Sequence, residues 1–199
     1  MFDRLREHVR DRIGLTDEEF PLCTSLMVPK RIRKDAFLLQ EGEKPAYLAF
    51  VTKGCLRSYT IDRKGQEHIV QFAPEGWWIS DLYSFLSGRE ASYCIDALED
   101  SDVLLMDAAS YETLCTTVPK FERYFRILLQ NNYIATHRRL VASISMSAEE
   151  RYLQMIEEFP SLVQRVALRH IASYLGITPE ALSRIRNRIA KNRTVPVPR

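Results

Sequence analysis

The sequence of 199 residues predicts an α+β fold, in which an antiparallel β sandwich or barrel is followed by a long helix and a helix-turn-helix. Three observations lead to this fold class. Short β-branched and aromatic runs, separated by turn residues, occupy most of residues 25–107. A helical pattern extends over residues 119–144. Residues 166–189 form two short helical patterns joined by a tight turn.

The first half of the chain combines helical and strand signals. Residues Phe2 to Ile13 have a helical pattern, and Thr16 to Glu19 is a capping box that predicts a second short turn of helix. Four runs have the length and composition of strands: Phe37–Gln40, Tyr47–Val51, Leu56–Ile61 and His68–Phe72. Turn signals punctuate them at Glu41-Gly42, Lys53-Gly54, Asp62–Gly65 and Pro74–Gly76. This spacing is typical of an antiparallel sandwich or barrel.

Helical signals return at Ala108–Thr117 and continue in a long helix from Pro119 to about Ile144. Its first half is strongly apolar, and a second apolar row repeats every seven residues at Ile127, Ile134 and Val141, with Ile144 following. We expect a dimer seam here; the alternative is one broad face buried within the monomer. Next, the capping box Ser147 to Glu150 opens a helix from Arg151 to Phe159, which Pro160 breaks.

The C-terminal region has the order of signals expected of a helix-turn-helix. Leu168, Ile171, Ala172 and Leu175 give the first helix one apolar face, and Gly176 ends it. In the second helix, Thr178 is a suitable N-cap, Pro179 suits the first position, and Glu180 favours the positive end of the dipole. The side chains expected to face outward are Ser183, Arg184, Arg186 and Arg188. Such a second helix lies in a DNA major groove; the alternative is a helical hairpin with a solvated basic face.

Charge is distributed unevenly behind a net charge of +2. Residues 1–136 contain 17 Lys/Arg and 21 Asp/Glu, whereas residues 137–199 contain 11 and 5. From Arg165 onward there are 8 basic residues and 1 acidic residue, a net charge of +7. A basic end on an acidic body suggests a nucleic-acid-binding module, although a basic tail can also be merely solvated.

The composition argues against several other classes. The four cysteines and four histidines are scattered, with no Cys-x-x-Cys pair, so we expect no metal and no cofactor. Widely separated cysteines fit buried thiols in a reducing cytoplasm. No apolar run approaches the roughly 18 residues that span a membrane, and the charged N-terminus does not resemble a signal peptide. We therefore expect a cytoplasmic protein without a membrane partner.

This order of elements resembles the Crp/Fnr family of bacterial transcription regulators, from about Ser25 to Ile189. The resemblance implies an N-terminal jelly roll of the cyclic-nucleotide-binding type over residues 1–118, a dimerisation helix over 119–145 and a DNA-binding domain over 146–199. It also implies a homodimer on double-stranded DNA, an unknown small-molecule effector and RNA polymerase as candidate partners, and no enzymatic activity.

The segment Gly76–Asp96 resembles the family's phosphate-binding cassette. In nucleotide-binding members, a Gly-Glu pair precedes an arginine and a small hydroxyl residue, and the arginine holds the cyclic phosphate. Here the pair is Ser80-Asp81, followed by Leu82, and the arginine position falls on Ala91, with Ser92 next. A buried phosphate without a cation loses roughly 3–5 kcal/mol, or about two to four decades of affinity. We therefore expect no cyclic AMP binding, unless Arg89 supplies the charge from two residues away. Four aromatic residues suggest an aromatic pocket, or simply core packing: Trp77, Trp78, Tyr83 and Tyr93.

The resemblance places the base-reading positions on Pro179, Glu180 and Arg184. Glu180 can accept from cytosine and Arg184 can donate to guanine, whereas Pro179 cannot read a base. Expected phosphate contacts are Ser183, Arg186 and Arg188, with Arg165 and Arg169 from the preceding segment. Many family members continue into a β-hairpin wing; this sequence either lacks the wing or ends before it.

Two other classes remain open on sequence alone. A cupin-type enzyme would gather several histidines on neighbouring strands, but only His68 lies in the strand region, so this class is disfavoured. The other class is a ligand-binding or scaffold jelly-roll protein that has lost regulated DNA binding. The change at Ala91 fits that class, whereas Glu180 and Arg184 oppose it.

Overall fold

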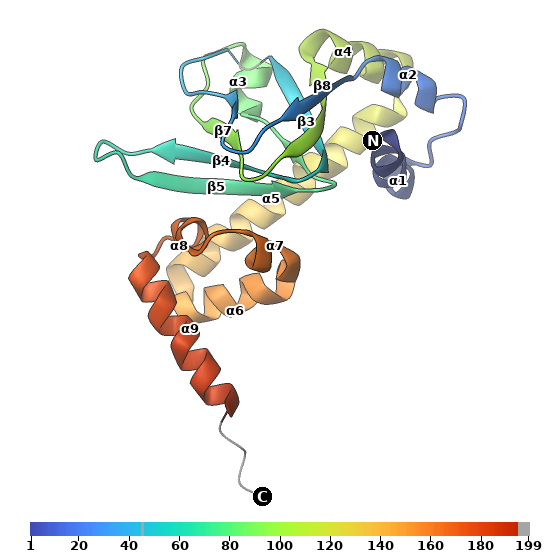
Figure 1. Cartoon of the computed structure of the whole chain (residues 1–199). Coiled ribbons are helices and arrows are strands. Elements are labelled where there is room, and N and C mark those ends of the chain that lie inside the picture. Colours follow the sequence, from blue (N-terminus) through green and yellow to red (C-terminus); the bar gives the residue numbers. More distant parts are fainter. Residues whose placement is uncertain (45, 195–199) are drawn as a thin grey trace, which may run out of the picture.

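The computed structural model describes residues 1–44 and 46–194, and side chains as far as Lys191 (Figure 1). Two helices come first, α1 (Phe2–Ile13) and α2 (Phe20–Ser25). The predicted capping box before α2 is formed: the Thr16 N–H donates to a Glu19 carboxylate oxygen (2.9 Å), and the Glu19 N–H donates to the Thr16 hydroxyl (3.3 Å).

The predicted antiparallel sandwich is confirmed, and it consists of two four-stranded sheets. One has the order β1-β8-β3-β6 and the other β2-β7-β4-β5. The strands are β1 (Val28–Ile32), β2 (Phe37–Leu39), β3 (Tyr47–Lys53), β4 (Cys55–Ile61), β5 (Glu67–Pro74), β6 (Trp78–Ile79), β7 (Cys94–Ala97) and β8 (Ser101–Asp107). A short helix, α3 (Leu82–Ser87), interrupts the strands inside the cassette segment. We call this part the roll.

The turn between β3 and β4 requires a glycine. Gly54 has φ 91°, and a Cβ added there would lie 2.2 Å from the Ser101 Oγ atom of β8. The turn therefore allows a close approach between the β3–β4 corner and the start of β8.

Helices make up the rest of the described chain. After α4 (Ala108–Thr117), the long helix α5 (Lys120–Ser145) leaves the side of α1, passes beneath the roll and reaches four C-terminal helices (Figure 1). These are α6 (Ala148–Glu158), α7 (Pro160–Arg165), α8 (Leu168–Leu175) and α9 (Pro179–Thr194), which we call the reading head.

Two sequence predictions need correction in this region. The helix predicted from Arg151 starts at Ala148, because Ser147 and Glu150 form a complete capping box. Pro160 does end α6, but it also occupies the first position of α7, a helix that the sequence analysis did not predict.

Three clusters of buried apolar side chains hold the fold. One joins α1, α2, α4 and the start of α5 to β3 and β8, and another lies between the two sheets. The third joins Tyr59, Ile69 and Phe72 of the roll to buried residues of the reading head, including Ile171 and Leu182. The roll and the reading head therefore share a hydrophobic core.

Candidate functional site

The helix-turn-helix is present as predicted and is closed by backbone hydrogen bonds. Gly176 ends α8 in the left-handed region (φ 68°), and the N–H of Ile177 donates to the Ala172 carbonyl at 3.0 Å. Thr178 caps α9, since its hydroxyl accepts from the N–H of Ala181 at 3.2 Å. The turn between the helices is therefore three residues long and tightly constrained.

Helix α9 has one buried and one exposed face. Leu182 and Ile185 are buried in the core shared with the roll, at 0% and 5% exposure. At 100° per residue, the opposite face carries Glu180, Ser183 and Arg184, all of which are exposed. Asn187 lies on this face as well and was missed, although its spacing of four residues from Ser183 would have identified it. We call these four residues the outer face of α9.

Glu180, at the N-terminal end of the outer face, is held in its ionised form. Hydrogen bonds from its own backbone N–H and from Thr178 lower the pKa of Glu180, and the nearby Arg184 adds to this effect. An ionised Glu180 can only accept hydrogen bonds, whereas Arg184 can only donate them. The face thus presents an acceptor and a donor within one helical turn.

The remaining predicted arginines are exposed but differ in their partners. Arg186 lies at one flank of the outer face, and Arg169 lies on α8. Arg188, at the other flank, pairs with Glu149 of α6 at 2.9 Å. Arg165 donates to Glu75 at 2.8 Å and also pairs with Glu99, so it ties α7 to the roll. Arg165, predicted to contact phosphate, therefore has carboxylate partners in this structure, as Arg188 does.

In the cassette segment, the carboxylate of Asp81 accepts hydrogen bonds from two backbone N–H groups. Asp81 is 1% exposed. One of its oxygens caps α3 by accepting from the N–H of Ser84 (3.2 Å), and the other accepts from the N–H of Ser92 (2.7 Å). Ser80 donates its hydroxyl to the carbonyl of Tyr47 (3.0 Å), and Leu82 packs against the core beside α1.

At the arginine position of the cassette, the backbone of Ala91 is hydrogen-bonded to the loop at residues 42–43. Ala91 is buried, its N–H donates to the carbonyl of Glu43 (2.7 Å), and its carbonyl accepts from Gly42 (2.9 Å). Arg89 is exposed and lies over the ring of Tyr83, 5.9 Å from its centroid. Arg89 is thus held at the surface over Tyr83.

The four aromatic residues near the cassette do not line one pocket. Trp78 packs on Phe50 and Phe125 in the core, with ring centroids 5.3 and 5.9 Å apart. Trp77 packs against Phe159 of the reading head at 5.8 Å, and Tyr83 is 62% exposed. The suggestion of an aromatic pocket is therefore replaced by core packing and surface exposure.

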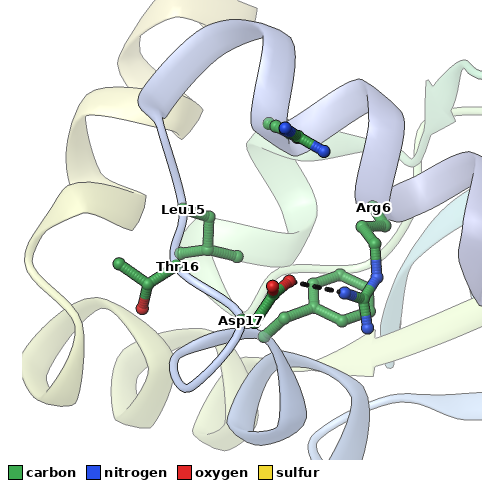
Figure 2. Close-up of a pocket in the computed structure, with 6 residues that line it drawn as sticks. Arg6, Leu15, Thr16 and Asp17 are labelled. Atoms are coloured by element: carbon green, nitrogen blue, oxygen red, sulfur yellow. Dashed lines mark hydrogen bonds and ion pairs between the residues drawn. The ribbon is translucent and has the colours of Figure 1, made fainter.

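Two pockets lie away from the cassette. A pocket of about 170 Å³ between α1 and α2 contains the Arg6–Asp17 ion pair (2.8 Å) and is also lined by Leu15 and Thr16 (Figure 2). A wider pocket of about 580 Å³ lies between α4 and α5 and includes Arg123, Arg126 and Leu129. Neither pocket is lined by the predicted effector residues.

Within residues 1–44 and 46–194, no group of three or more His, Cys, Asp or Glu residues is placed to hold a metal ion. Over the same ranges, no helix combines the length and apolar character needed to cross a bilayer. All four cysteines are buried free thiols, and burial raises the pKa of Cys23 and Cys55 to about 12.

The second half of α5 is exposed and apolar on one side. Ile127 is half-buried, whereas Ile134, Val141 and Ile144 are 47%, 48% and 79% exposed. Leu129, Tyr133 and Leu140 add further exposed apolar surface along the same helix. This surface is not covered within the protomer, which supports the seam over the alternative of a face buried in the monomer.

Comparison with known proteins gives consistent matches. Residues 29–117 match the cyclic nucleotide-binding domain family. The chain is 26% identical over 197 residues to the transcriptional regulatory protein Btr of Bordetella pertussis, covering 92% of this chain and 80% of that one. It is 27% identical over 179 residues to the anaerobic regulatory protein of Aggregatibacter actinomycetemcomitans, covering 81% and 66%.

The fold is also that of known structures. The structure of FixK2 from Bradyrhizobium japonicum aligns with a TM-score of 0.73 at 21% identity, over 86% of this chain and 88% of that one. At this level of identity, the likeness establishes the fold. It confirms the predicted α+β architecture of roll, long helix and C-terminal helices.

Proposed function

We propose that the chain is a transcription regulator of the Crp/Fnr type that binds double-stranded DNA as a homodimer, a proposal supported by its match to the cyclic nucleotide-binding domain family and its similarity to named regulators. The outer face of α9 carries this proposal. It belongs to a helix-turn-helix whose opposite face is buried, and it presents Glu180 and Arg184 to solvent. Such a regulator would act in the bacterial cytoplasm, where the DNA is.

Within the proposed interface, the roles of the residues follow from their chemistry. Arg184 would donate two hydrogen bonds to a guanine, and Glu180 would accept from a cytosine N4. Ser183, Arg186, Arg188 and Arg169 would hold phosphates, which positions the protein without reading sequence. Thr178 shapes the N-terminal end of α9 that enters the groove.

We also propose that the roll does not bind cyclic AMP. Asp81 already satisfies the N–H groups of Ser84 and Ser92, and Ala91 offers no cation for a phosphate. A phosphate at this place would lie beside a buried carboxylate, which would repel it. A different effector, or none, would act through this domain. The named relatives are regulators, and we extend the same non-enzymatic role to this chain.

The test of DNA binding is a selection from random duplexes with the full-length chain. We expect an inverted repeat whose half-sites lie about 34 Å, or a multiple of it, apart. Arg184→Ala should relax the preference at one base pair and cost ~1–3 kcal/mol, whereas Arg188→Ala should weaken binding to all sequences about equally.

Two results would count against this function. One is a selection without an enriched palindrome, combined with a shallow dependence of affinity on salt. The other is equal behaviour of the two arginine variants. Either result would favour the alternative of a scaffold or ligand-binding protein.

A further inference from the structure

The strand β5 lies at the open edge of its sheet, and the reading head covers that edge. In the order β2-β7-β4-β5, the outward backbone groups of β5 have no neighbouring strand. Unpaired groups on an edge strand are normally left to water or covered by other elements. Here α8 lies beneath the β4–β5 hairpin, and α9 extends from it away from the roll (Figure 1).

One serine of α8 satisfies two of these backbone groups. The Ser173 hydroxyl donates to the carbonyl of Glu67 at 2.7 Å and accepts from the N–H of Ile69 at 3.0 Å. It therefore bonds to β5 as a neighbouring strand would. Both bonds join residues more than 100 positions apart in the chain.

An arginine of α5 completes the contact at an irregularity of the strand. The pairing of β4 with β5 shifts register between Ser58 and Tyr59, which leaves Val70 without a partner in the ladder. The carbonyl of Val70 accepts from Arg139, whose guanidinium also lies 4.8 Å from the ring centroid of Tyr174. Tyr174 in turn packs on Phe72 of β5 at 5.2 Å. We call Arg139, Ser173 and Tyr174 the edge latch.

A buried ion cluster reinforces this docking. Arg57 of β4 binds Asp96 through two hydrogen bonds of 2.8 Å, and it also pairs with Glu67. The Nη1 atom that pairs with Glu67 also lies 3.0 Å from Nδ1 of His170 on α8. His170, Ser173 and Tyr174 are spaced three and four residues apart, so they occupy the side of α8 that faces the roll.

The covalent connection between α5 and the reading head is short. Only Met146 and Ser147 separate the end of α5 from the start of α6, and Met146 is extended (φ −111°, ψ 146°). Arg151 braces this joint by donating to the carbonyls of Met146 (2.8 Å) and Leu175 (3.1 Å). Without the edge latch, the shared hydrophobic core and the Arg57–His170 contact would remain, but the polar contacts that set the angle of the head about this joint would be lost.

We propose that Ser173 and Arg139 are positioning residues for DNA recognition, which fix the orientation of α9 relative to the dimer helix α5. This inference rests on the proposed function. Two copies of α9 must meet successive major grooves at a set distance, so their orientation must be fixed before binding. The docked head leaves the outer face of α9 exposed, so the latched arrangement is compatible with DNA binding.

The test compares Ser173→Ala with Ser161→Ala, an exposed serine on α7 outside the latch. Hydrogen exchange of the Ile69 amide, read by NMR in the full-length chain, reports the latch without DNA. Affinity is measured for palindromes with different half-site spacings and, at low salt, for a duplex with one half-site. Arg139→Met, compared with Arg138→Met, tests the second latch residue in the same way.

For Ser173→Ala we expect faster exchange of Ile69 and a flatter dependence of affinity on spacing. If each head is then correctly oriented about one third of the time, each half-site loses about threefold in affinity, and the palindrome about tenfold. The affinity for a duplex with one half-site should fall by the threefold orientation factor, with any further change below about threefold. Ser161→Ala should behave as the wild type.

Faster exchange with an unchanged spacing profile would overturn the proposal, because the latch would then be only structural. Tighter DNA binding by Ser173→Ala would also overturn it, since the latch would then hold an inhibited state. Unchanged exchange would show that the two hydrogen bonds do not hold the edge. If the wild type binds no duplex while Ile69 exchange responds as expected, the proposed function fails, and this inference fails with it. If the wild type binds DNA but Ser173→Ala leaves the spacing profile unchanged, only this inference fails.

Discussion

His8 occupies a part-buried hydrogen-bond chain that joins α1, α5 and β6, the short strand within the cassette segment. Its Nδ1 lies 2.7 Å from the hydroxyl of Tyr124, and that hydroxyl accepts from Nε1 of Trp78 at 2.8 Å. Because the indole can only donate, the hydroxyl proton of Tyr124 is free to point at His8. Burial and the neighbouring Arg12 lower the pKa of His8 to about 4.

This pKa predicts a loss of stability in mild acid. The unfolded chain takes up a proton at His8 near pH 6.5, whereas the folded chain does so only near pH 4. The contribution to stability is therefore complete above about pH 6.5 and is lost as the pH falls towards 4. We expect the free energy of unfolding to fall in this window, by less than the full ~1.4 kcal/mol per pH unit, because His8 is only partly buried and solvent screens its charge. Urea titrations at several pH values should show a smaller slope for His8→Gln and an unchanged slope for the exposed His137→Gln. Equal slopes for all three proteins would refute the assignment.

At the cassette, the carboxylate of Asp81 predicts indifference to cyclic nucleotides. A ligand at ~100 times its Kd should stabilise the fold by ~2.7 kcal/mol, which a melting experiment detects easily. We expect no change in Tm with millimolar cyclic AMP or cyclic GMP. Calorimetry that detects micromolar binding would contradict this and would direct attention to Arg89.

At the scale of single elements, the exposed side of α5 predicts the oligomeric state. Ile134 and Val141 are about half exposed in the protomer, so lysine at both positions should leave the fold intact. In a dimer the same lysines would place charge in an apolar seam. Light scattering should show the double variant Ile134→Lys/Val141→Lys as a folded monomer with weak affinity for palindromic DNA. Leu86→Lys, on the exposed side of α3, should remain dimeric. A monomeric wild type at micromolar concentration would exclude the seam.

Elements with local signals were the ones that the sequence predicted well. Both capping boxes, the helix α4, the long helix α5 and the turn at Gly176 depend on residues within a few positions of each other. The strand β1 was not singled out, because Val28–Ile32 contains a proline and two basic residues and is mostly exposed at a sheet edge. The two-residue strand β6 is too short to give a pattern.

The outer face of α9 could be read from sequence because helical spacing alone separates it from Leu182 and Ile185. The contacts of the reading head with the roll could not be predicted from the sequence. Arg57 and His170 are 113 residues apart, and nothing near either one indicates the other. A comparably long separation, 90 residues between Arg165 and Glu75, explains why Arg165 was assigned to phosphate rather than to Glu75.

At the scale of the whole molecule, the Arg57 cluster connects three strands of the roll, β4, β5 and β7, to the reading head. The side chains of Arg57 and Asp96 are only 7% and 9% exposed. Burial on its own would lower the pKa of Arg57, but the hydrogen bonds to Asp96 and Glu67 raise it, so the guanidinium stays charged.

Removing one partner of this buried pair should be costly. We expect Asp96→Asn to reduce the free energy of unfolding by ~3 kcal/mol, because it leaves a buried charge poorly compensated. The exposed pair Arg31–Asp100 provides the comparison: Arg31→Ala should cost less than ~1 kcal/mol. Urea denaturation of both variants measures the difference. A loss below 1 kcal/mol for Asp96→Asn would mean that water reaches the cluster.

The core that joins β4, β5 and β7 to the reading head limits how this regulator can be recombined with others. A hybrid made by exchanging heads at Met146 would keep the peptide connection but lose the partners of Tyr59, Ile69 and Phe72. Such a hybrid would become functional only if the surface of the β4–β5 hairpin were transplanted together with the head. The unit to exchange in engineering this protein is therefore the head together with its hairpin, although some 70 residues of chain separate the two.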